Sequence, residues 1–372
     1  MPRELVATAP RTPELREYEE PDLGPRQVGV RTEFASPKHG TELVGYRNEP
    51  SASRPYDPQW GCMLPRGNTG AGNFPMRLGN MAVGVITEIG PLVTRYRPGD
   101  RIFGHLPIRE THTVEETAVD PMPDGLTAEA AVCLDPAVMA MAMRDAPVRI
   151  GDRVAIFGLG AIGLMAVQFA CLGGADFVIA LDPIEARRNL AQSLGADVAL
   201  DPTSDDGDAG LAIRKITQEL GAGNLDLPEP KRVLGGYWDR PQDRSGLGVD
   251  VAVEASGNVR ALHQAIRATR YGGTICVVSF YGGDAAGLRL GDEFHVNRLQ
   301  LVSTRSESIP MRDHPGWNLQ RYVDLSLRWL ASGKLRADGI ITPTVSFEDS
   351  VDAYRSIDER PAEAIKLGIR FP

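Results

Sequence analysis

The sequence predicts an α/β protein in two parts, an irregular β-rich part followed by a doubly wound parallel sheet. Short alternating apolar runs punctuated by Gly and Pro fill residues 5–146, as in QVGVRTEFA and MAVGVITEIG. The pattern changes at Gly151, where a strand, a helix and a second strand follow one another within about thirty residues. Such a crossover joins parallel strands, and the alternation continues to about residue 304.

Each element of the second part follows from its own pattern. Buried apolar runs predict strands at 153–158, 176–182, near Val198, 249–254, 274–278 and 299–304. Amphipathic or apolar stretches predict helices at 161–172, 183–194, 211–220, 259–269 and 319–331. Residues 221–248 are rich in Pro, Gly and charge and too long for an ordinary connection, so we expect a surface insertion or a contact loop there. The tail from Ile340 is expected to return to the first part.

Composition excludes several classes of protein. The 372 residues are 42% hydrophobic, enough for a large core, and 49 acidic against 40 basic residues give a net charge of -9. This balance offers no electrostatic footprint for nucleic acid or an anionic membrane. The four cysteines form no C-x-x-C pair, the N-terminus is polar, and no apolar run reaches membrane-spanning length. We therefore expect a soluble, cytoplasmic protein with a small-molecule substrate.

A G-x-G-x-x-G motif opens the second part, directly after a predicted strand and at the start of a predicted helix. In this context the first glycine makes a tight turn, the second admits the pyrophosphate of a dinucleotide, and the third lets helix and strand pack closely. Asp182 ends the next strand about twenty residues later, where a carboxylate accepts ribose hydroxyls and repels a 2′-phosphate. The sequence therefore predicts NAD as cofactor, held at Gly158, Leu159, Gly160, Ala161, Ile162 and Gly163 and at Asp182.

Four further residues belong to the predicted cofactor site. Arg187 lies one turn into the next helix, where it covers the adenosine or is simply a solvated charge. Ser256, Ser279 and Phe280 follow later strands at the carboxyl edge of the sheet, which a dinucleotide crosses.

At this point the chain resembles the medium-chain dehydrogenase/reductase superfamily, which contains zinc-dependent alcohol and polyol dehydrogenases and zinc-free quinone and enoyl reductases. The motifs that carry the resemblance occur in order as RPGDRIFG, MPDGLTAEAA, GLGAIGLMAVQFA and VDVAVEASGNVRALHQAIRATRYGGTICVV. It implies a GroES-like β-barrel catalytic domain from residues 1–148 and 306–372, and a Rossmann domain over 149–305. It also implies a homodimer or homotetramer.

The zinc-ligand positions depart from the family pattern. Where the family reads Gly-x-Cys-Gly-Thr-Asp, residues 37–42 place His39 at the cysteine position. Where it reads Gly-His-Glu, the chain has Asn80 in place of the histidine, and Asp135 matches a third ligand position. The four-cysteine structural lobe is absent.

These departures argue against a catalytic zinc. Such a site needs three protein ligands, and only His39 and Asp135 remain. We therefore expect no bound metal, with one alternative left open, that His105 or Cys62 completes an unconventional site.

Without a metal, acid–base groups must remove the hydroxyl proton and stabilise the oxyanion. His39 is the expected general base, Thr41 matches the hydroxyl-relay position, and Asn80 is expected to donate to the developing oxyanion. Asp135 would orient His39 or bind a second substrate hydroxyl. The alternative for His39 is a buried histidine that satisfies backbone groups. Lys38 would add positive potential, although a plain exposed lysine is the simpler expectation.

A long loop over residues 46–78 carries Tyr56, Trp60, Arg66 and Phe74. Rings and guanidinium groups suit a polyhydroxylated or anionic substrate, unless the aromatic residues only pin the loop to the barrel. The Gly–Thr–Glu variant of the first motif also resembles a zinc-free subgroup related to sugar-type and bacteriochlorophyllide dehydrogenases.

Together these features predict an NAD-dependent, zinc-independent dehydrogenase that interconverts a secondary alcohol and a ketone on a polyol, sugar or cyclitol-like substrate. One alternative is an NADPH-dependent quinone or enoyl reductase, against which Asp182 argues. The other is a non-catalytic NAD-binding protein that lost its chemistry along with the zinc ligands.

Overall fold

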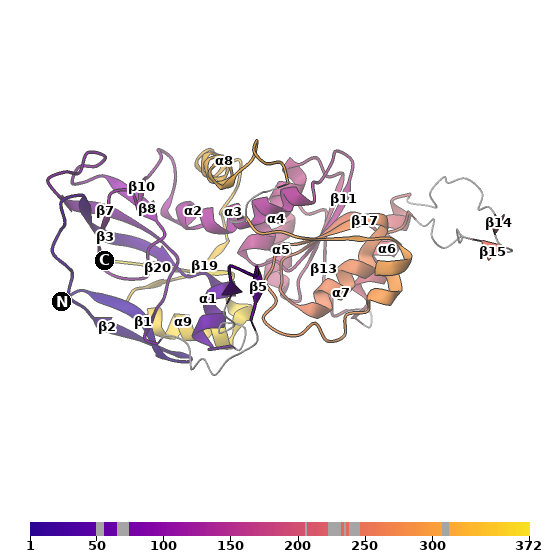
Figure 1. Ribbon diagram of the computed structural model, residues 1–372, viewed down its shortest axis with the longest axis horizontal. Coiled ribbons are helices and arrows are strands. Elements are labelled where there is room, and N and C mark those ends of the chain that lie inside the picture. Colours follow the sequence, from indigo (N-terminus) through magenta and orange to yellow (C-terminus); the bar gives the residue numbers. More distant parts are fainter. Residues whose placement is uncertain are drawn as a thin grey trace. The chain divides into compact units, whose positions relative to one another are not determined.

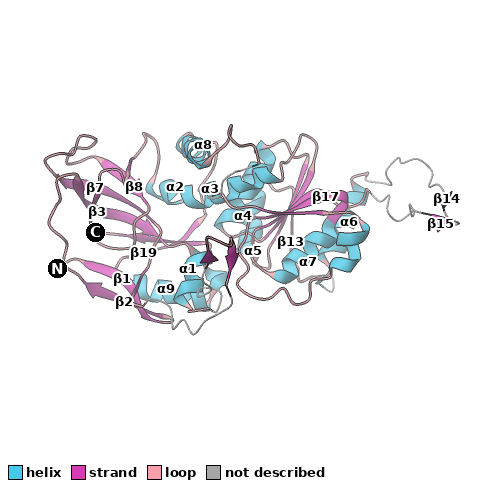
Figure 2. Cartoon of the chain, viewed as in Figure 1, coloured by secondary structure: helices cyan, strands magenta, loops and turns pink. Residues whose placement is uncertain are grey.

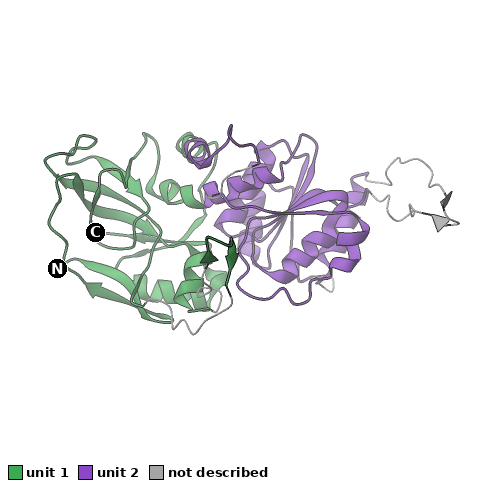
Figure 3. Ribbon diagram, in the orientation of Figure 1, with its two compact units in different colours: residues 1–135, 327–372 green, residues 136–326 purple. Residues whose placement is uncertain are grey.

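The chain folds into two compact units (Figure 3). The computed structural model describes residues 1–49, 56–64, 74–204, 207–221, 232–233, 236–237, 246–306 and 312–372 (Figure 1). Unit 1 comprises Met1–Asp135 and Leu327–Pro372, and unit 2 comprises Pro136–Ser326. Residues 136–148 and 306–326 thus group with the second unit, whereas we expected them in the first. The reason is local, because the 3₁₀ helix Ala142–Asp145 packs against strand β17 (Thr269–Val277) of unit 2.

Two sheets form most of unit 1, beside the short pair β4 (Tyr56–Asp57) and β5 (Cys62–Met63). The smaller has the order β2-β1-β6, and the larger has the order β10-β8-β7-β3-β20-β19, with β9 also paired to β3. The C-terminal strand β20 pairs antiparallel with β3, so the tail returns to the first unit as predicted. The strands are β1 Arg3–Ala9, β2 Thr12–Glu17, β3 Gln27–Ser36, β6 Met76–Arg77, β7 Met81–Ile89, β8 Arg101–Gly104, β9 Thr111–Glu115, β10 Asp120–Pro121, β19 Ile341–Ser346 and β20 Lys366–Arg370.

Helices pack beside these sheets and complete the core of unit 1. Helix α1 begins at His39, three residues after β3 ends, and buries Leu43 and Tyr46. Tyr46 meets Tyr354 of α9 edge to face, with ring centroids 5.0 Å apart. The helices are α1 His39–Tyr46, α2 Ala128–Val132, α3 Leu134–Met141, which crosses into unit 2, and α9 Ser350–Glu359.

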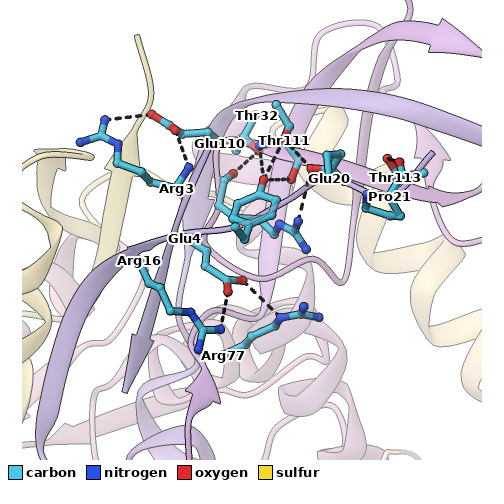
Figure 4. A network of polar contacts seen from close by, with 12 residues as sticks. Arg3, Glu4, Arg16, Glu20, Pro21, Thr32, Arg77, Glu110, Thr111 and Thr113 are labelled. Atoms are coloured by element: carbon cyan, nitrogen blue, oxygen red, sulfur yellow. Dashed lines mark hydrogen bonds and ion pairs between the residues drawn. The ribbon is translucent and has the colours of Figure 1, made fainter. Parts of the chain in front are cut away.

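Charged hydrogen bonds fasten the N-terminal hairpin to the rest of unit 1 (Figure 4). The buried carboxylate of Glu4 pairs with Arg16 at 2.6 Å and with Arg77 at 3.2 Å. Arg3 pairs with Glu110 at 2.9 Å. The Glu4 carboxylate is buried whereas its two arginine partners are partly exposed, so these pairs compensate a buried charge and favour the observed register of the hairpin.

Unit 2 is a six-stranded sheet in the order β13-β12-β11-β16-β17-β18, and every pairing is parallel. This is the doubly wound 3-2-1-4-5-6 order, which reverses direction between β11 and β16. Figure 2 shows the helices beside these strands. The elements are β11 Arg153–Phe157, α4 Ala161–Leu172, β12 Phe177–Leu181, α5 Glu185–Ser193, β13 Val198–Leu200, α6 Ala209–Glu219, β16 Val249–Glu254, α7 Val259–Ala268, β17 Thr269–Val277, β18 Gln300–Ser303 and α8 Leu319–Ala331, whose last turns belong to unit 1.

The predicted elements of this part are all present, with small differences at their ends. Helix α6 begins earlier than predicted because the Asp208 carboxylate caps it by accepting from the Leu211 amide. Strand β17 begins at Thr269 rather than Thr274, because Thr269 pairs with Val249 across an irregularity in register.

The predicted insertion at 221–248 lies mostly outside the described residues, which include its two ends and the short pair β14 (Arg232–Val233) and β15 (Gly236–Tyr237). Among the described helices, none combines the length and the apolar character needed to cross a bilayer.

Candidate active site

The glycine motif forms the turn between β11 and α4. Gly158 has a φ of +90°, a conformation that favours glycine, and a Cβ there would lie 2.6 Å from Ser256. A Cβ on Gly163 would lie 1.8 Å from the carbonyl oxygen of Gly158. A Cβ on Gly160 would meet nothing within 4 Å. The first and third glycines are therefore required by packing, whereas the second leaves open space, which fits the approach of a pyrophosphate.

The start of α4 fits an anion. Gly160 occupies the N-cap position and has no side chain with which to cap the helix. The amides of the first turn, at Ala161 and Ile162, are then left for an outside acceptor at the positive end of the helix dipole. These residues fit the phosphates of a dinucleotide.

Asp182 ties the glycine turn to the end of β12. Its carboxylate is buried and accepts from the amides of Leu159 at 2.8 Å and Ile184 at 2.9 Å. A carboxylate has about four acceptor sites, so capacity remains for ribose hydroxyls. Arg187 lies 3.6 Å from the same carboxylate and is mostly buried, so it is an ion-pair partner rather than a solvated charge.

Glu254, which was not among the predicted site residues, binds groups of the loops that follow β16 and β17 at the carboxyl edge of the sheet. Its fully buried carboxylate accepts from the hydroxyls of Ser256, Ser279 and Tyr281 and from two backbone amides. Burial, followed by the charge of Glu254, raises the pKa of Tyr281, which keeps that hydroxyl a donor. Phe280 stands between these donors with its side chain exposed. A carboxylate that ends a buried apolar strand was the available signal.

In unit 1, three of the predicted catalytic positions lie on segments that polar contacts join. We refer to Lys38, His39, Glu42, Asn80, Asp135 and Lys366 as the polar cluster. Lys38 is not a plain exposed lysine, because its Nζ lies 3.0 Å from Oδ1 of the buried Asp135. His39 accepts the backbone amide of Leu367 on Nε2 at 3.0 Å, and Thr41 is exposed at the start of α1. His39 thus does satisfy a backbone group, the alternative that the sequence left open.

Glu42 connects the two segments that carry the cluster. Its carboxylate accepts from the amides of Lys38 at 3.2 Å and Gly79 at 3.0 Å and from the Tyr354 hydroxyl at 2.6 Å. Burial raises the pKa of Glu42, and these three donors oppose that rise. The Nδ2 of Asn80 is buried and has no hydrogen-bond partner among the described residues. That donor is available to a ligand.

Lys366 is a second cation in the cluster and was not predicted. It is buried in β20, and its Nζ donates to the carbonyl of Pro37 at 2.7 Å. Burial lowers the pKa of Lys366, while Cys133, Asp135 and Glu42 act in the opposite direction.

The cluster does not fit a catalytic zinc. The Nε2 of His39 and the Oδ1 of Asp135 are already engaged by an amide and an ammonium group. In the described ranges, no group of three or more His, Cys, Asp or Glu side chains is arranged to hold a metal. His105 contacts the Asn80 carbonyl at 3.3 Å, and Cys62 is exposed on β5 (Cys62–Met63).

The loop predicted to line the substrate pocket is only partly described, and Arg66 lies outside the described residues. Phe74 packs against the core of unit 1 and therefore anchors the loop. Tyr56 on β4 (Tyr56–Asp57) and Trp60 are 59% and 71% exposed, so they do not anchor it.

Comparison with known proteins identifies the family to which the chain belongs. Residues 161–313 match the family model of zinc-binding dehydrogenases. The chain is 37% identical over 378 residues to D-guloside 3-dehydrogenase from Escherichia coli (strain K12), covering 99% of this chain and 100% of the relative. The chain belongs to the medium-chain dehydrogenase/reductase superfamily. This member is an oxidoreductase of the alcohol dehydrogenase type, and its relatives act on alcohols and sugars.

Solved structures share the fold over the whole length. 2R,3R-butanediol dehydrogenase from Bacillus subtilis superposes with a TM-score of 0.71 at 22% identity, covering 100% of this chain and 99% of that chain. A Sinorhizobium meliloti 1021 chain bound to NADP gives a TM-score of 0.68 at 19% identity, with coverage of 100% and 99%. At these identities the likeness concerns the fold alone.

Proposed function

We propose that this protein is an NAD-dependent, zinc-independent dehydrogenase that interconverts a ring secondary alcohol and a ketone on a sugar, a glycoside or a related polyol. The observation that carries the proposal is the full-length relationship to D-guloside 3-dehydrogenase. The polar cluster of unit 1 supports it, because its donors suit a substrate rich in hydroxyl groups.

The glycine turn supports the cofactor assignment. Gly158–Gly163 and the first turn of α4 would hold the pyrophosphate, and Asp182 would accept the hydroxyls of the adenosine ribose. The bound cofactor supplies the acceptor for a hydride. Although a solved relative binds NADP, the buried carboxylate of Asp182 opposes a 2′-phosphate and favours NAD.

The first unit supplies the proton chemistry. We assign the hydroxyl proton to the imidazole of His39, which the Leu367 amide holds in place, and its onward transfer to water to the exposed Thr41. The unpartnered Nδ2 of Asn80 donates to the oxygen as negative charge develops. Asp135 contributes through its ion pair with Lys38.

A coenzyme and substrate panel tests the proposal. Purified protein is mixed with NAD⁺ or NADP⁺ and with methyl hexopyranosides epimeric at each ring position, open-chain polyols or cyclitols, and absorbance of the reduced cofactor is followed. We expect turnover with NAD⁺ and a pyranoside or related polyol. Reduction of quinones or enoyl compounds by NADPH alone would instead establish the reductase alternative. Tight NADH binding without turnover on any compound would establish a non-catalytic NAD-binding protein.

The proposal extends to assembly and location. Strand β18 is the edge of the unit 2 sheet, and its Leu301 is 41% exposed, which supports pairing of two copies at this edge. We expect a dimer or tetramer by light scattering, and a monomer would contradict this. The four unpaired cysteines support action in the reducing cytoplasm, which cell fractionation tests.

A further inference from the structure

We propose that the Lys38 ammonium group, held by Asp135, binds the substrate oxygen and stabilises its negative charge, the electrostatic task that a metal ion performs in zinc-dependent dehydrogenases. This inference rests on the proposed function and adds a catalytic residue to it.

The position of Lys38 is fixed at both ends of the residue. Its backbone amide donates to Glu42 at 3.2 Å, and its Nζ lies 3.0 Å from Oδ1 of Asp135. The side chain of Asp135 is 6% exposed and that of Lys38 is 22% exposed. An ammonium group has three donors, and Asp135 takes one at this distance. The partly exposed Nζ therefore retains donors for a ligand that reaches it from solvent.

A second observation concerns the neighbouring segment, which carries Asn80. The Nδ2 of Asn80 is buried without a hydrogen-bond partner among the described residues. Glu42 binds the amides of both Lys38 and Gly79, so the segments that carry Lys38 and Asn80 are joined through one carboxylate. A buried donor that lacks an acceptor is costly unless a ligand supplies one. Lys38 and Asn80 thus each retain a donor for a ligand, one charged and one neutral.

Lys38 is paired with Asp135 through its side chain and with Glu42 through its backbone amide, and the buried Lys366 interacts electrostatically with the same two carboxylates. The ammonium group of Lys38 attracts negative charge that develops on an entering oxygen, and Asp135 holds that group in place.

The reaction balances with Lys38 unchanged. The carbinol C–H bond breaks, and NAD⁺, held at Gly158–Gly163, would accept the hydride with both electrons. The O–H bond breaks, and its proton passes to His39. The C–O bond becomes a carbonyl. Lys38 donates a hydrogen bond throughout and keeps its own protons, so its contribution is electrostatic.

Substitution separates charge from packing. We expect Lys38→Met, which is neutral and of similar length, to lower kcat about a hundredfold or more, because a donor to the oxyanion is lost. The Kd for NADH should stay within about twofold, since the cofactor residues lie in unit 2. Lys38→Arg keeps the charge and should retain activity within about tenfold. Lys215→Met, at an exposed position of α6, is the matched control and should behave as wild type.

Chemical rescue gives a readout that a merely structural ion pair would not produce. Lys38→Ala leaves room beside Asp135 for a small amine. Methylammonium or ethylammonium should raise kcat of this variant about tenfold or more, whereas tetramethylammonium, which has no N–H donor, should not. Thermal melting by circular dichroism checks the fold of each variant. If Lys38→Met fails to fold, the role of Lys38 is tested by the activity of Lys38→Arg and by the response of Lys38→Ala to amines.

These experiments distinguish a failure of the proposed function from a failure of the role of Lys38. Wild-type protein that turns over no alcohol refutes both the proposed function and this inference. Wild-type turnover that survives in Lys38→Met, or equal rescue by tetramethylammonium, refutes only the role of Lys38. Activity that requires added Zn²⁺ in wild type also refutes it, because the metal then stabilises the oxyanion.

Discussion

The glycine turn of unit 2 and the polar cluster of unit 1 differ in how they are determined by the sequence. In the turn, six consecutive residues fix the geometry, because Gly163 lies against the carbonyl of Gly158 and no side chain fits between them. In the cluster, the groups come from positions 38–42, 79–80, 135 and 366, and distant segments supply their partners. The comparison teaches that a short motif is sufficient to determine the backbone of the glycine turn. The chemistry of the polar cluster depends instead on partners that lie far apart in the sequence.

The largest expected effect tests the backbone constraint. In Gly163→Ala, the new Cβ would overlap the Gly158 carbonyl oxygen, so the turn or α4 must shift. We expect the affinity for NADH, measured by fluorescence titration, to fall about a hundredfold or more, together with a lower melting temperature. Gly160→Ala is the matched control, because its Cβ meets nothing within 4 Å. It should keep the wild-type melting temperature and lose affinity only. Equal destabilisation of both variants would contradict the packing argument.

The next effect separates the two roles of His39. His39→Gln retains an oxygen that accepts the Leu367 amide but cannot act as an imidazole base, whereas His39→Ala loses both functions. We expect kcat to fall about a hundredfold in both variants, with loss of the near-neutral limb of the pH–rate profile. Melting temperature should fall mainly in His39→Ala. A Gln variant with wild-type kcat would show that His39 is purely structural.

Another histidine of unit 1, His112, sharpens the contrast because burial is the main influence on its pKa. Burial lowers the pKa of His112 to about 3, with Arg109 adding to the effect. In the unfolded chain, His112 binds a proton below about pH 6.5, whereas in the folded chain it binds one only below about pH 3. The free energy of unfolding therefore falls as the pH drops from about 6.5 to about 3. Between pH 7 and pH 5 we expect wild type to lose about 2 kcal/mol more than His112→Gln, by urea unfolding. Parallel losses in the two proteins would contradict this.

A smaller effect tests the electrostatics of the glycine turn. Asp182→Asn keeps the size of the side chain but removes its charge. We expect affinity for NADH to fall and affinity for NADPH to rise, so that the ratio of the two Kd values changes about tenfold. Glu219→Gln, on the exposed end of α6, is the control for a neutralised carboxylate in the same unit. An unchanged ratio would mean that Asp182 does not choose the coenzyme.

The sequence predicts well those features that depend on neighbouring residues, and less well those that depend on distant ones. Helix α4 has the predicted bounds, because the glycine turn before it and the long apolar run within it are local signals. The pairing of Lys38 with Asp135 and the burial of Lys366 and Glu254 were not predicted. Asp135 and Pro37 lie far in sequence from their lysine partners, and Ser279 and Tyr281 follow a later strand than Glu254, so no local pattern identifies these partners. His39 was located by its motif, but its bond to Leu367 became visible only when β20 was placed.

The measurement that tests the account most directly is turnover by wild-type protein freed of metal with a chelator and verified by elemental analysis. With NAD⁺ and an active sugar or polyol, the account predicts undiminished NADH formation in this protein and no gain on adding Zn²⁺. Loss of activity that Zn²⁺ restores would contradict it. In that case His39 and Asp135 would be metal ligands, and Lys38 would have to leave Asp135 for the enzyme to work.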